Sequence, residues 1–169
     1  LDSGKLVSNA GDVNGDGFDD VIVGAPRVKL NGGYSGVSYV VFGKASAFDA
    51  SMNLVDLDGR DGFRLGGVYT YAAVSSAGDL NGDGFDDVII GAPDGGYVVF
   101  GKASGFDATM NLSDIDGNDG FRLEGADPHF GSHGAVISDA GDINGDGFDD
   151  VIVGSPSAGP RYSSEYNYY

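Results

Sequence analysis

Residues 12–20, DVNGDGFDD, occur three times in this chain with almost no change, and this recurrence decides the fold. The other copies are DLNGDGFDD at 79–87 and DINGDGFDD at 142–150, so that the motifs begin 67 and 63 residues apart. Each copy follows Ala-Gly and precedes a short apolar run, VIVG or VIIG. Self-similarity at a nearly constant spacing indicates structural units that stack on one another.

Two further elements occur twice each between these motifs. The sequence YVVFGKAS stands at 39–46 and 97–104, and DGFRL stands at 61–65 and 119–123. With the run ahead of each Ala-Gly, a unit contains four short stretches rich in Val, Ile, Tyr and Phe and bounded by Gly, Pro, Asp and Asn, which favours strands. Helical periodicity is not sustained anywhere, and one helical turn is expected over 48–54. A further GFRL strand is expected to precede Leu1 in the parent gene.

The runs VIVG and YVVFG are continuously apolar, so their sheets must be covered on both faces. No connection is long enough for covering helices, and small antiparallel sheets stacked around an axis meet the condition instead. We predict an all-β fold, a partial β-propeller of about three four-stranded antiparallel blades. One segment, 1–169, would hold blades at approximately 1–65, 66–124 and 125–169. Residues 161–169 replace YVVFG in the third unit, so its blade is expected to be incomplete, and nine extra residues within 27–36 are expected to form a loop.

Composition narrows the classes of function. The 169 residues include 26 Asp and Glu against nine Lys and Arg, a formal charge of −17, which disfavours nucleic acids and anionic membranes and favours cations. Cysteine is missing, which excludes a disulfide scaffold and a thiolate metal site. The apolar runs are too short to span a bilayer. No signal peptide pattern opens the chain, which begins with Leu1 and is expected to be a processed chain or a fragment.

The repeated motif has the spacing of a calcium loop. Asp12, Asn14 and Asp16 offer side-chain oxygens at positions 1, 3 and 5, Gly17 permits a sharp turn at position 6, and positions 7 and 9 add a carbonyl and a carboxylate. Hard oxygen ligands select Ca²⁺ over Zn²⁺ or Cu²⁺, with Mg²⁺ as the weaker alternative. An EF-hand would need Glu at position 12, where Val or Ile stands here. A plain turn is the alternative for one copy, but three acidic copies favour a metal.

We therefore predict three Ca²⁺ per chain, one in each loop. The aspartates at position 8 are expected to turn away from the loop centre and to start the following strand or to lie around the ligands rather than ligate; these are Asp19, Asp86 and Asp149. The predicted ligands are, with each Phe contributing its carbonyl, Asp12, Asn14, Asp16, Phe18 and Asp20; Asp79, Asn81, Asp83, Phe85 and Asp87; and Asp142, Asn144, Asp146, Phe148 and Asp150.

These loops, together with Phe-Gly at 42–43 and 100–101 and Gly-Ala-Pro at 24–26 and 91–93, resemble the FG-GAP repeat family. That family occurs in the β-propeller of integrin α subunits and in many bacterial surface or secreted proteins. The resemblance covers nearly the whole chain, and the near-identical copies without Cys are more similar to bacterial members. It implies a calcium-stabilised propeller with the ligands named above, located extracellularly, at the cell surface or in the periplasm.

The function expected from this resemblance is an extracellular binding or adhesion module for a protein or glycan ligand. The alternatives are a structural spacer or scaffold in a larger surface protein, and the non-catalytic domain of a secreted enzyme. Open blade faces, with runs such as 88–90 and 97–100, favour self-association or a place in a longer propeller.

Other clusters point to ordinary structure. No catalytic set stands out, because there is no Cys nucleophile and the two His share one loop, so the chain is not expected to be an enzyme. His129 and His133 with Asp127 are interpreted as loop residues. Two acidic runs are interpreted as polar turns before the GFRL strand rather than second calcium loops: Asp56, Asp58 and Asp61, and Asp114, Asp116 and Asp119.

Overall fold

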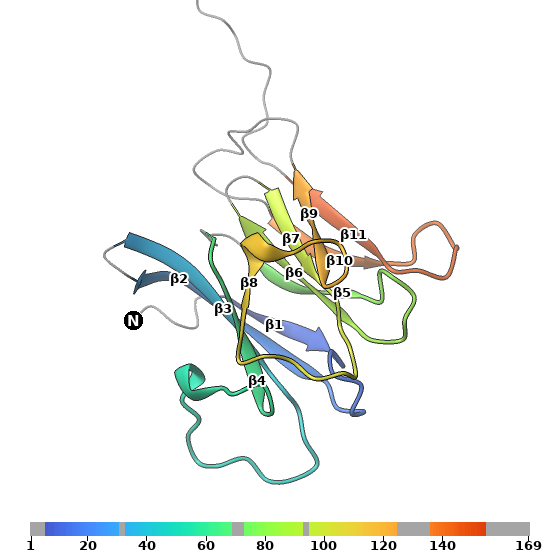
Figure 1. The fold of residues 1–169 in the computed structure, drawn as a ribbon. Coiled ribbons are helices and arrows are strands. Elements are labelled where there is room, and N and C mark those ends of the chain that lie inside the picture. The colour runs from blue at the N-terminus through green and yellow to red at the C-terminus, as the bar shows by residue number, and fades with distance from the viewer. Residues whose placement is uncertain (1–5, 31–32, 69–72, 93–94, 125–135, 155–169) are drawn as a thin grey trace, which may run out of the picture.

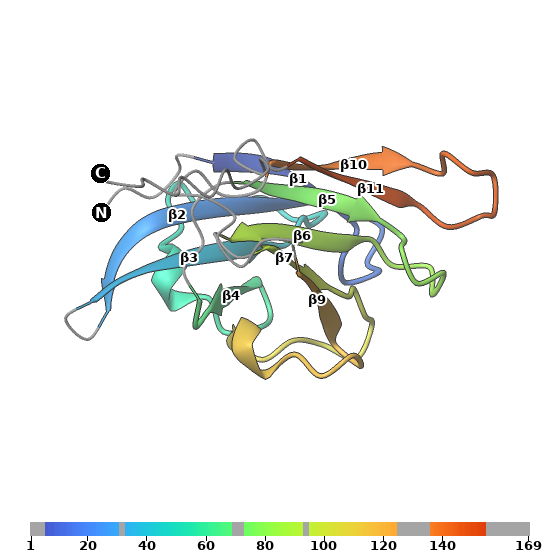
Figure 2. The same cartoon turned by 90° about the horizontal axis from the view of Figure 1, so that it is seen from above.

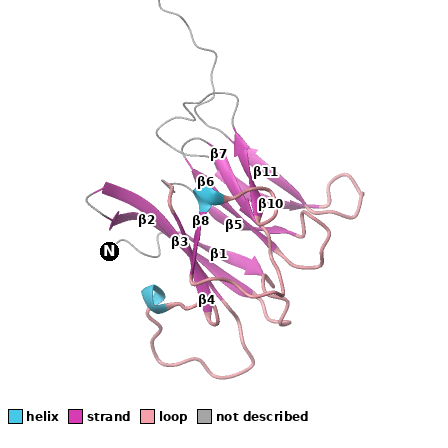
Figure 3. Ribbon diagram, viewed as in Figure 1, coloured by secondary structure: helices cyan, strands magenta, loops and turns pink. Residues whose placement is uncertain are grey.

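The computed structural model describes residues 6–30, 33–68, 73–92, 95–124 and 136–154, where strands joined by loops make up the regular structure apart from two short 3-10 turns (Figures 1 and 3). The first sheet contains β1 (Leu6–Gly11), β2 (Asp20–Leu30), β3 (Gly33–Val41), β4 (Gly62–Gly66) and β8 (Thr109–Asn111). The second contains β5 (Val74–Gly78), β6 (Asp87–Ala92), β7 (Gly95–Val99) and β9 (Gly120–Glu124). The third contains β10 (Val136–Gly141) and β11 (Asp150–Gly154).

In each sheet the consecutive strands of one repeat pair antiparallel and the acidic loop joins the first two of them, while β8 is added to the first sheet in parallel. The strands of the repeats run in the orders β1-β2-β3-β4 and β5-β6-β7-β9, and β10 pairs with β11 in the same way. The first strands lie along one side of the stack, where β5 contacts both β1 and β10 (Figure 2). This arrangement confirms the predicted partial β-propeller. The blade boundaries stay a prediction. Residues 161–169, for which an incomplete third blade is expected, lie outside the described residues.

The core lies between neighbouring blades. One cluster joins the first two sheets and includes Ile22, Val40, Phe63, Val88, Ile90 and Val99. Another joins the second and third sheets and contains Ala77, Ile89, Val98 and Ile137. Because side chains alternate along a strand, β6 sends Val88 and Ile90 to one interface and Ile89 to the other. The middle blade therefore needs strands that are apolar on both sides, as the sequence predicts.

The exposed apolar residues differ from those expected. The runs 88–90 and 97–99 belong to the middle blade and are buried, so the prediction that they stay open is wrong. The open faces belong instead to the outer blades, where Val7 is 62% and Ile152 60% exposed. Part of the first blade is also covered by its own chain, because Leu57 packs with Ala25, Val37 and Tyr39.

Strand β8 connects the second repeat to the first blade. It pairs in parallel with β4, and Phe106 just before it stacks on Phe63 with ring centroids 4.3 Å apart. The equivalent segment of the first repeat, 48–53, contains no strand or helix. The prediction of a helical turn over 48–54 is wrong, because the 3-10 helix η1 begins only at the last residue of this range and spans Leu54–Asp56. The second repeat has the equivalent 3-10 helix η2 (Leu112–Asp114).

The nine extra residues of the first repeat lengthen a hairpin rather than forming the expected loop. β2 and β3 stay paired from Val28 and Ser35 to Leu30 and Gly33. The ladder is irregular between Ala25 and Val28, around a proline that has no N–H to donate. The hairpin could have been predicted from Asn-Gly at 31–32, which is a favoured turn sequence between two strands.

Candidate metal loops

The aspartate at position 1 organises each loop through backbone hydrogen bonds. Oδ1 of Asp12 accepts from the N–H groups of Gly15 at 2.8 Å and Asp16 at 3.0 Å, and its Oδ2 accepts from Gly17 at 2.8 Å. Asp79 and Asp142 repeat all three contacts in their own loops. The Gly147 N–H is the main group that lowers the pKa of Asp142, because it stabilises the charged carboxylate. One carboxylate thus curls the chain around itself.

Positions 3 and 5 are drawn into the same curl. Oδ1 of Asn14 accepts from the Asp16 N–H at 2.9 Å, and Nδ2 of Asn14 donates to Oδ2 of Asp16 at 3.1 Å. Oδ1 of Asp16 accepts from the Phe18 N–H at 3.0 Å. The second loop repeats these three bonds through Asn81 and Asp83, and the third repeats two of them. Side-chain oxygens at positions 1, 3 and 5 therefore lie on one short turn in every copy.

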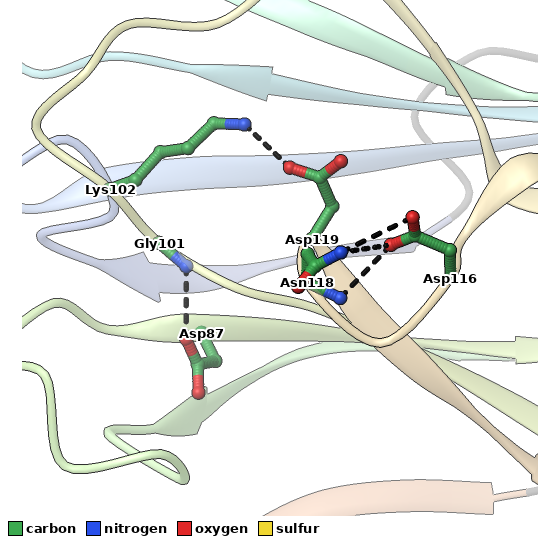
Figure 4. Close-up of polar contacts among 6 residues, drawn as sticks. All are labelled: Asp87, Gly101, Lys102, Asp116, Asn118 and Asp119. Carbon is green, nitrogen blue, oxygen red and sulfur yellow. Dashed lines mark hydrogen bonds and ion pairs between the residues drawn. The ribbon is translucent and has the colours of Figure 1, made fainter.

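The aspartate at position 9 is a buried link between the loop and the rest of the blade in the first two copies, Asp20 and Asp87. Asp20 accepts from the Val13 N–H at 3.0 Å and from the Gly43 N–H at 2.8 Å, so both of its carboxylate oxygens are engaged. Asp87 accepts in the same way from Leu80 and Gly101, the second of which is drawn in Figure 4. Asp150 accepts from the Ile143 N–H at 2.9 Å. This role in the fold was not predicted from the sequence.

Burial raises the pKa of two of these carboxylates, Asp20 and Asp87, well above the ordinary value. The pKa of Asp20 is raised to about 6, chiefly by burial and in smaller part by the nearby Asp16 and Asp12 carboxylates, despite the lowering effect of the hydrogen bonds from Gly43 and Val13. Burial likewise raises the pKa of Asp87 to about 7. In the first two loops the negative charges thus lie close enough to disfavour one another, which a bound cation would relieve.

The donors of each loop suit a hard cation, although the carboxylates are not gathered around one point. Within the described residues, no three Asp, Glu or His side chains form a group that could hold a metal by themselves. Each loop combines carboxylate oxygens with the side-chain amide of position 3 and backbone carbonyls. Such oxygen-only sets fit Ca²⁺, which takes six to eight oxygen ligands in flexible geometry, and not soft metals.

The weaker acidic runs form polar turns, as predicted. Oδ1 of Asp58 accepts from the Arg60 N–H, and Oδ1 of Asp116 accepts from the Asn118 N–H, both at 3.0 Å. Figure 4 shows the second of these turns beside the ion pair between Lys102 and Asp119, whose Nζ and Oδ1 are 2.8 Å apart. Asp127, His129 and His133 lie outside the described residues. No helix in the described part of the chain is long and apolar enough to cross a membrane.

Antiparallel blades that each carry an acidic loop between their first two strands define a propeller-forming repeat protein. Residues 7–41, 71–106 and 135–168 match the FG-GAP repeat, and the chain belongs to this family. Each of these three segments contains one of the acidic loops.

Curated relatives are integrin α subunits from animals. Integrin alpha-PS5 of Drosophila melanogaster is 32% identical over 162 residues, which cover 90% of this chain and 15% of the relative. Integrin alpha-4 of Xenopus laevis is 33% identical over 155 residues, covering 88% of this chain and 13% of the relative. Integrin alpha pat-2 of Caenorhabditis elegans is 34% identical over 164 residues, covering 88% and 12%. The chain therefore spans a small part of the length of these relatives.

Proposed function

We propose that this chain is a calcium-binding segment of an FG-GAP propeller that acts outside the cell as a binding or adhesion module. The observation that carries the proposal is the same hydrogen-bonded turn, with oxygens at positions 1, 3 and 5, in three loops. FG-GAP repeats and integrin α subunits are generally associated with divalent cations, which supports the choice of ligand class. A location at the cell surface or in the extracellular space agrees with these relatives, and the periplasm is the alternative for a bacterial protein.

Calcium has a definite physical task in this proposal. The chain has no cysteine, so disulfides cannot stabilise it, and its loops concentrate negative charge. A cation that binds only the folded state adds RT ln(1 + [Ca]/Kd), about 2.7 kcal/mol per site at a hundredfold excess over Kd. Three such sites would stiffen the ends of three blades and hold the neighbouring loops of the propeller in place for a protein or glycan ligand.

Calcium stoichiometry is the direct test of this proposal. We expect three Ca²⁺ per chain by elemental analysis after equilibration in millimolar calcium, because the three loops have the same ligands. The Kd should be about 10⁻⁴–10⁻³ M, the range of extracellular calcium modules. Asp83→Asn should lower the count by one, and Asp58→Asn, in a polar turn, should leave it unchanged. Fewer than two ions per wild-type chain would contradict the assignment.

The adhesion role needs a separate measurement. Calcium-loaded chain should bind a protein or glycan on an array of extracellular ligands, and a variant with Asp16, Asp83 and Asp146 all changed to Asn should lose that binding while it still folds. If the triple variant still binds the ligand, the ligand-binding surface does not depend on the calcium loops. No binding by folded, calcium-loaded wild-type chain would favour a structural spacer.

A further inference from the structure

The aspartate at position 8 joins the second and third loops to the loop of the preceding blade. Oδ2 of Asp86 accepts from the Asp12 N–H at 2.7 Å, and the Asp86 N–H donates to the Asp12 carbonyl at 3.2 Å. Asp149 makes the same two bonds with Asp79, at 2.9 and 3.2 Å. One residue of the following blade thus fixes both backbone polar groups of the residue at position 1.

The surroundings are shaped for this contact. Gly11 and Gly78, which stand just before position 1, have φ of +72° and +62°, and a Cβ on either would overlap the Asp86 or Asp149 carboxylate. Gly141 has the same place and φ of +61°, but within the described residues no atom lies within 4 Å of its added Cβ. The space is therefore filled only where a following blade supplies the aspartate.

An aromatic contact accompanies the aspartate. A Cβ on Gly15 or Gly82, at position 4, would overlap the Phe85 or Phe148 ring of the following blade. A Cβ on Gly145 would meet no described atom within 4 Å. The following blade therefore contacts the preceding loop in two ways. Its aspartate at position 8 holds the loop backbone by hydrogen bonds, and its phenylalanine at position 7 packs against the glycine at position 4.

The anchored residue is the one that organises the metal loop. The Asp12 carboxylate holds three backbone N–H groups of its own loop, so fixing the Asp12 backbone also fixes the place of those bonds. We propose that Asp86 and Asp149 are positioning residues that order the cation loops of the preceding blades, so that the affinity of a loop depends on the blade that follows it. This inference rests on the proposed calcium binding. Within the described residues, the third loop has no such support, and we expect it to bind calcium more weakly than the first two.

Each loop contains its own reporter. The amides of Gly17, Gly84 and Gly147 donate to the position 1 carboxylates of their own loops, at 2.8, 2.9 and 2.9 Å. Their NMR shifts should therefore follow calcium binding loop by loop. In the wild-type chain, Gly147 should respond at higher calcium than Gly17 and Gly84.

The decisive variants change position 8. Asp86→Ala should raise the calcium concentration needed at Gly17 at least fivefold and leave Gly147 unchanged, because only the Asp12 loop loses its anchor. Asp86→Asn, which keeps an acceptor oxygen, should restore most of the response. Asp19→Ala is the matched control, since the exposed Asp19 makes no hydrogen bond to any described residue. Should Asp86→Ala fail to fold, Asp149→Ala gives the same test at Gly84.

Two kinds of failure are distinguishable. Equal effects of Asp19→Ala and Asp86→Ala on the loops, or an effect of Asp86→Ala at Gly84 without one at Gly17, would overturn the positioning role. If no glycine of the wild-type chain responds to millimolar calcium, the proposed calcium binding fails instead. The anchor is then tested by melting the calcium-free protein, where Asp86→Ala must lower Tm more than Asp19→Ala for the contact to stand.

Discussion

Adjacent aspartates of the loop do different work at the scale of single residues. Asp86 reaches across the blade interface to Asp12, whereas Asp87 stays within its own blade and accepts from Leu80 and Gly101. Gly101 is required there, because an added Cβ would lie 2.7 Å from Cβ of Phe85 and 2.9 Å from the Val13 carbonyl oxygen. The Phe-Gly pair and the acidic loop are therefore joined by packing and hydrogen bonding into one unit, although Gly101 lies 14 residues after Asp87.

The raised pKa values of Asp20 and Asp87 give the calcium-free protein an unusual pH dependence. Between the ordinary value of 3.8 and the folded values of about 6 and about 7, the folded chain binds more protons than the unfolded chain. The free energy of unfolding should then fall as pH rises through this window, by at least about 1 kcal/mol. Urea unfolding in chelator from about pH 4.5 to 7.5 would measure it.

Two comparisons separate this effect from general charge repulsion. Asp87→Asn keeps an acceptor for the Gly101 N–H but cannot titrate, so its slope against pH should be shallower. Saturating calcium should flatten the wild-type slope as well, because a cation favours the ionised carboxylates. Equal slopes for Asp87→Asn and wild type would show that burial of this carboxylate does not control the pH dependence.

The acidic loops can be predicted from the sequence, but the residues of other blades or strands that hydrogen-bond to them cannot. The acid spacing predicts that position 8 turns away from the loop centre, which agrees with the contact of Asp86. Its partner, Asp12, is 74 residues away and belongs to another blade, so no local pattern reveals the bond. The same holds for Asp20, because the composition of its loop does not show that its carboxylate lies against the backbone of Gly43.

At the scale of elements, two nearly identical segments take different conformations. FDATMNL at 106–112 contains β8, which lies against β4, whereas FDASMNL at 48–54 contains no strand. The difference comes from the neighbour, since β4 offers the second repeat a sheet edge that no described strand offers the first. The strands of the repeats themselves are predictable, because their apolar runs are continuous and bounded by turn residues.

Burial by neighbouring blades also separates two equivalent residues of the repeat. Ile89 and Ile152 have the same place in their apolar runs, but Ile89 is 0% exposed and Ile152 is 60% exposed. Ile89→Ala should therefore cost about 2–5 kcal/mol of unfolding free energy. Ile152→Ala should change it by less than about 0.5 kcal/mol. Urea unfolding at low protein concentration compares them, and equal losses would mean that the second interface does not form in solution.

At the scale of the whole molecule, the two outer blades present faces that another blade would cover. Val7 and Val21 are exposed on the first blade, and Val136 and Ile152 on the third. In the middle blade the equivalent of Val7 is Val74, which is partly buried in one interface, and the equivalent of Ile152 is Ile89, which is fully buried in the other. The exposed faces thus have the chemistry of blade interfaces, which agrees with the proposal that the chain associates with further blades, either of a longer propeller or of a second copy.

This proposal makes association of the 169-residue chain dependent on calcium. The formal charge of −17 opposes contact between two copies, and three bound Ca²⁺ would reduce it to −11. Blades of two chains would then bring the total into the usual range of about four to eight. Light scattering should give a mass above that of a monomer in calcium and a lower mass in chelator. Ile152→Lys should abolish the increase by placing a charge on the open face, whereas Val55→Lys, at an equally exposed site on η1, should not. A wild-type monomer in calcium that binds no hydrophobic dye would show instead that the outer faces are stable in water and need no further blade.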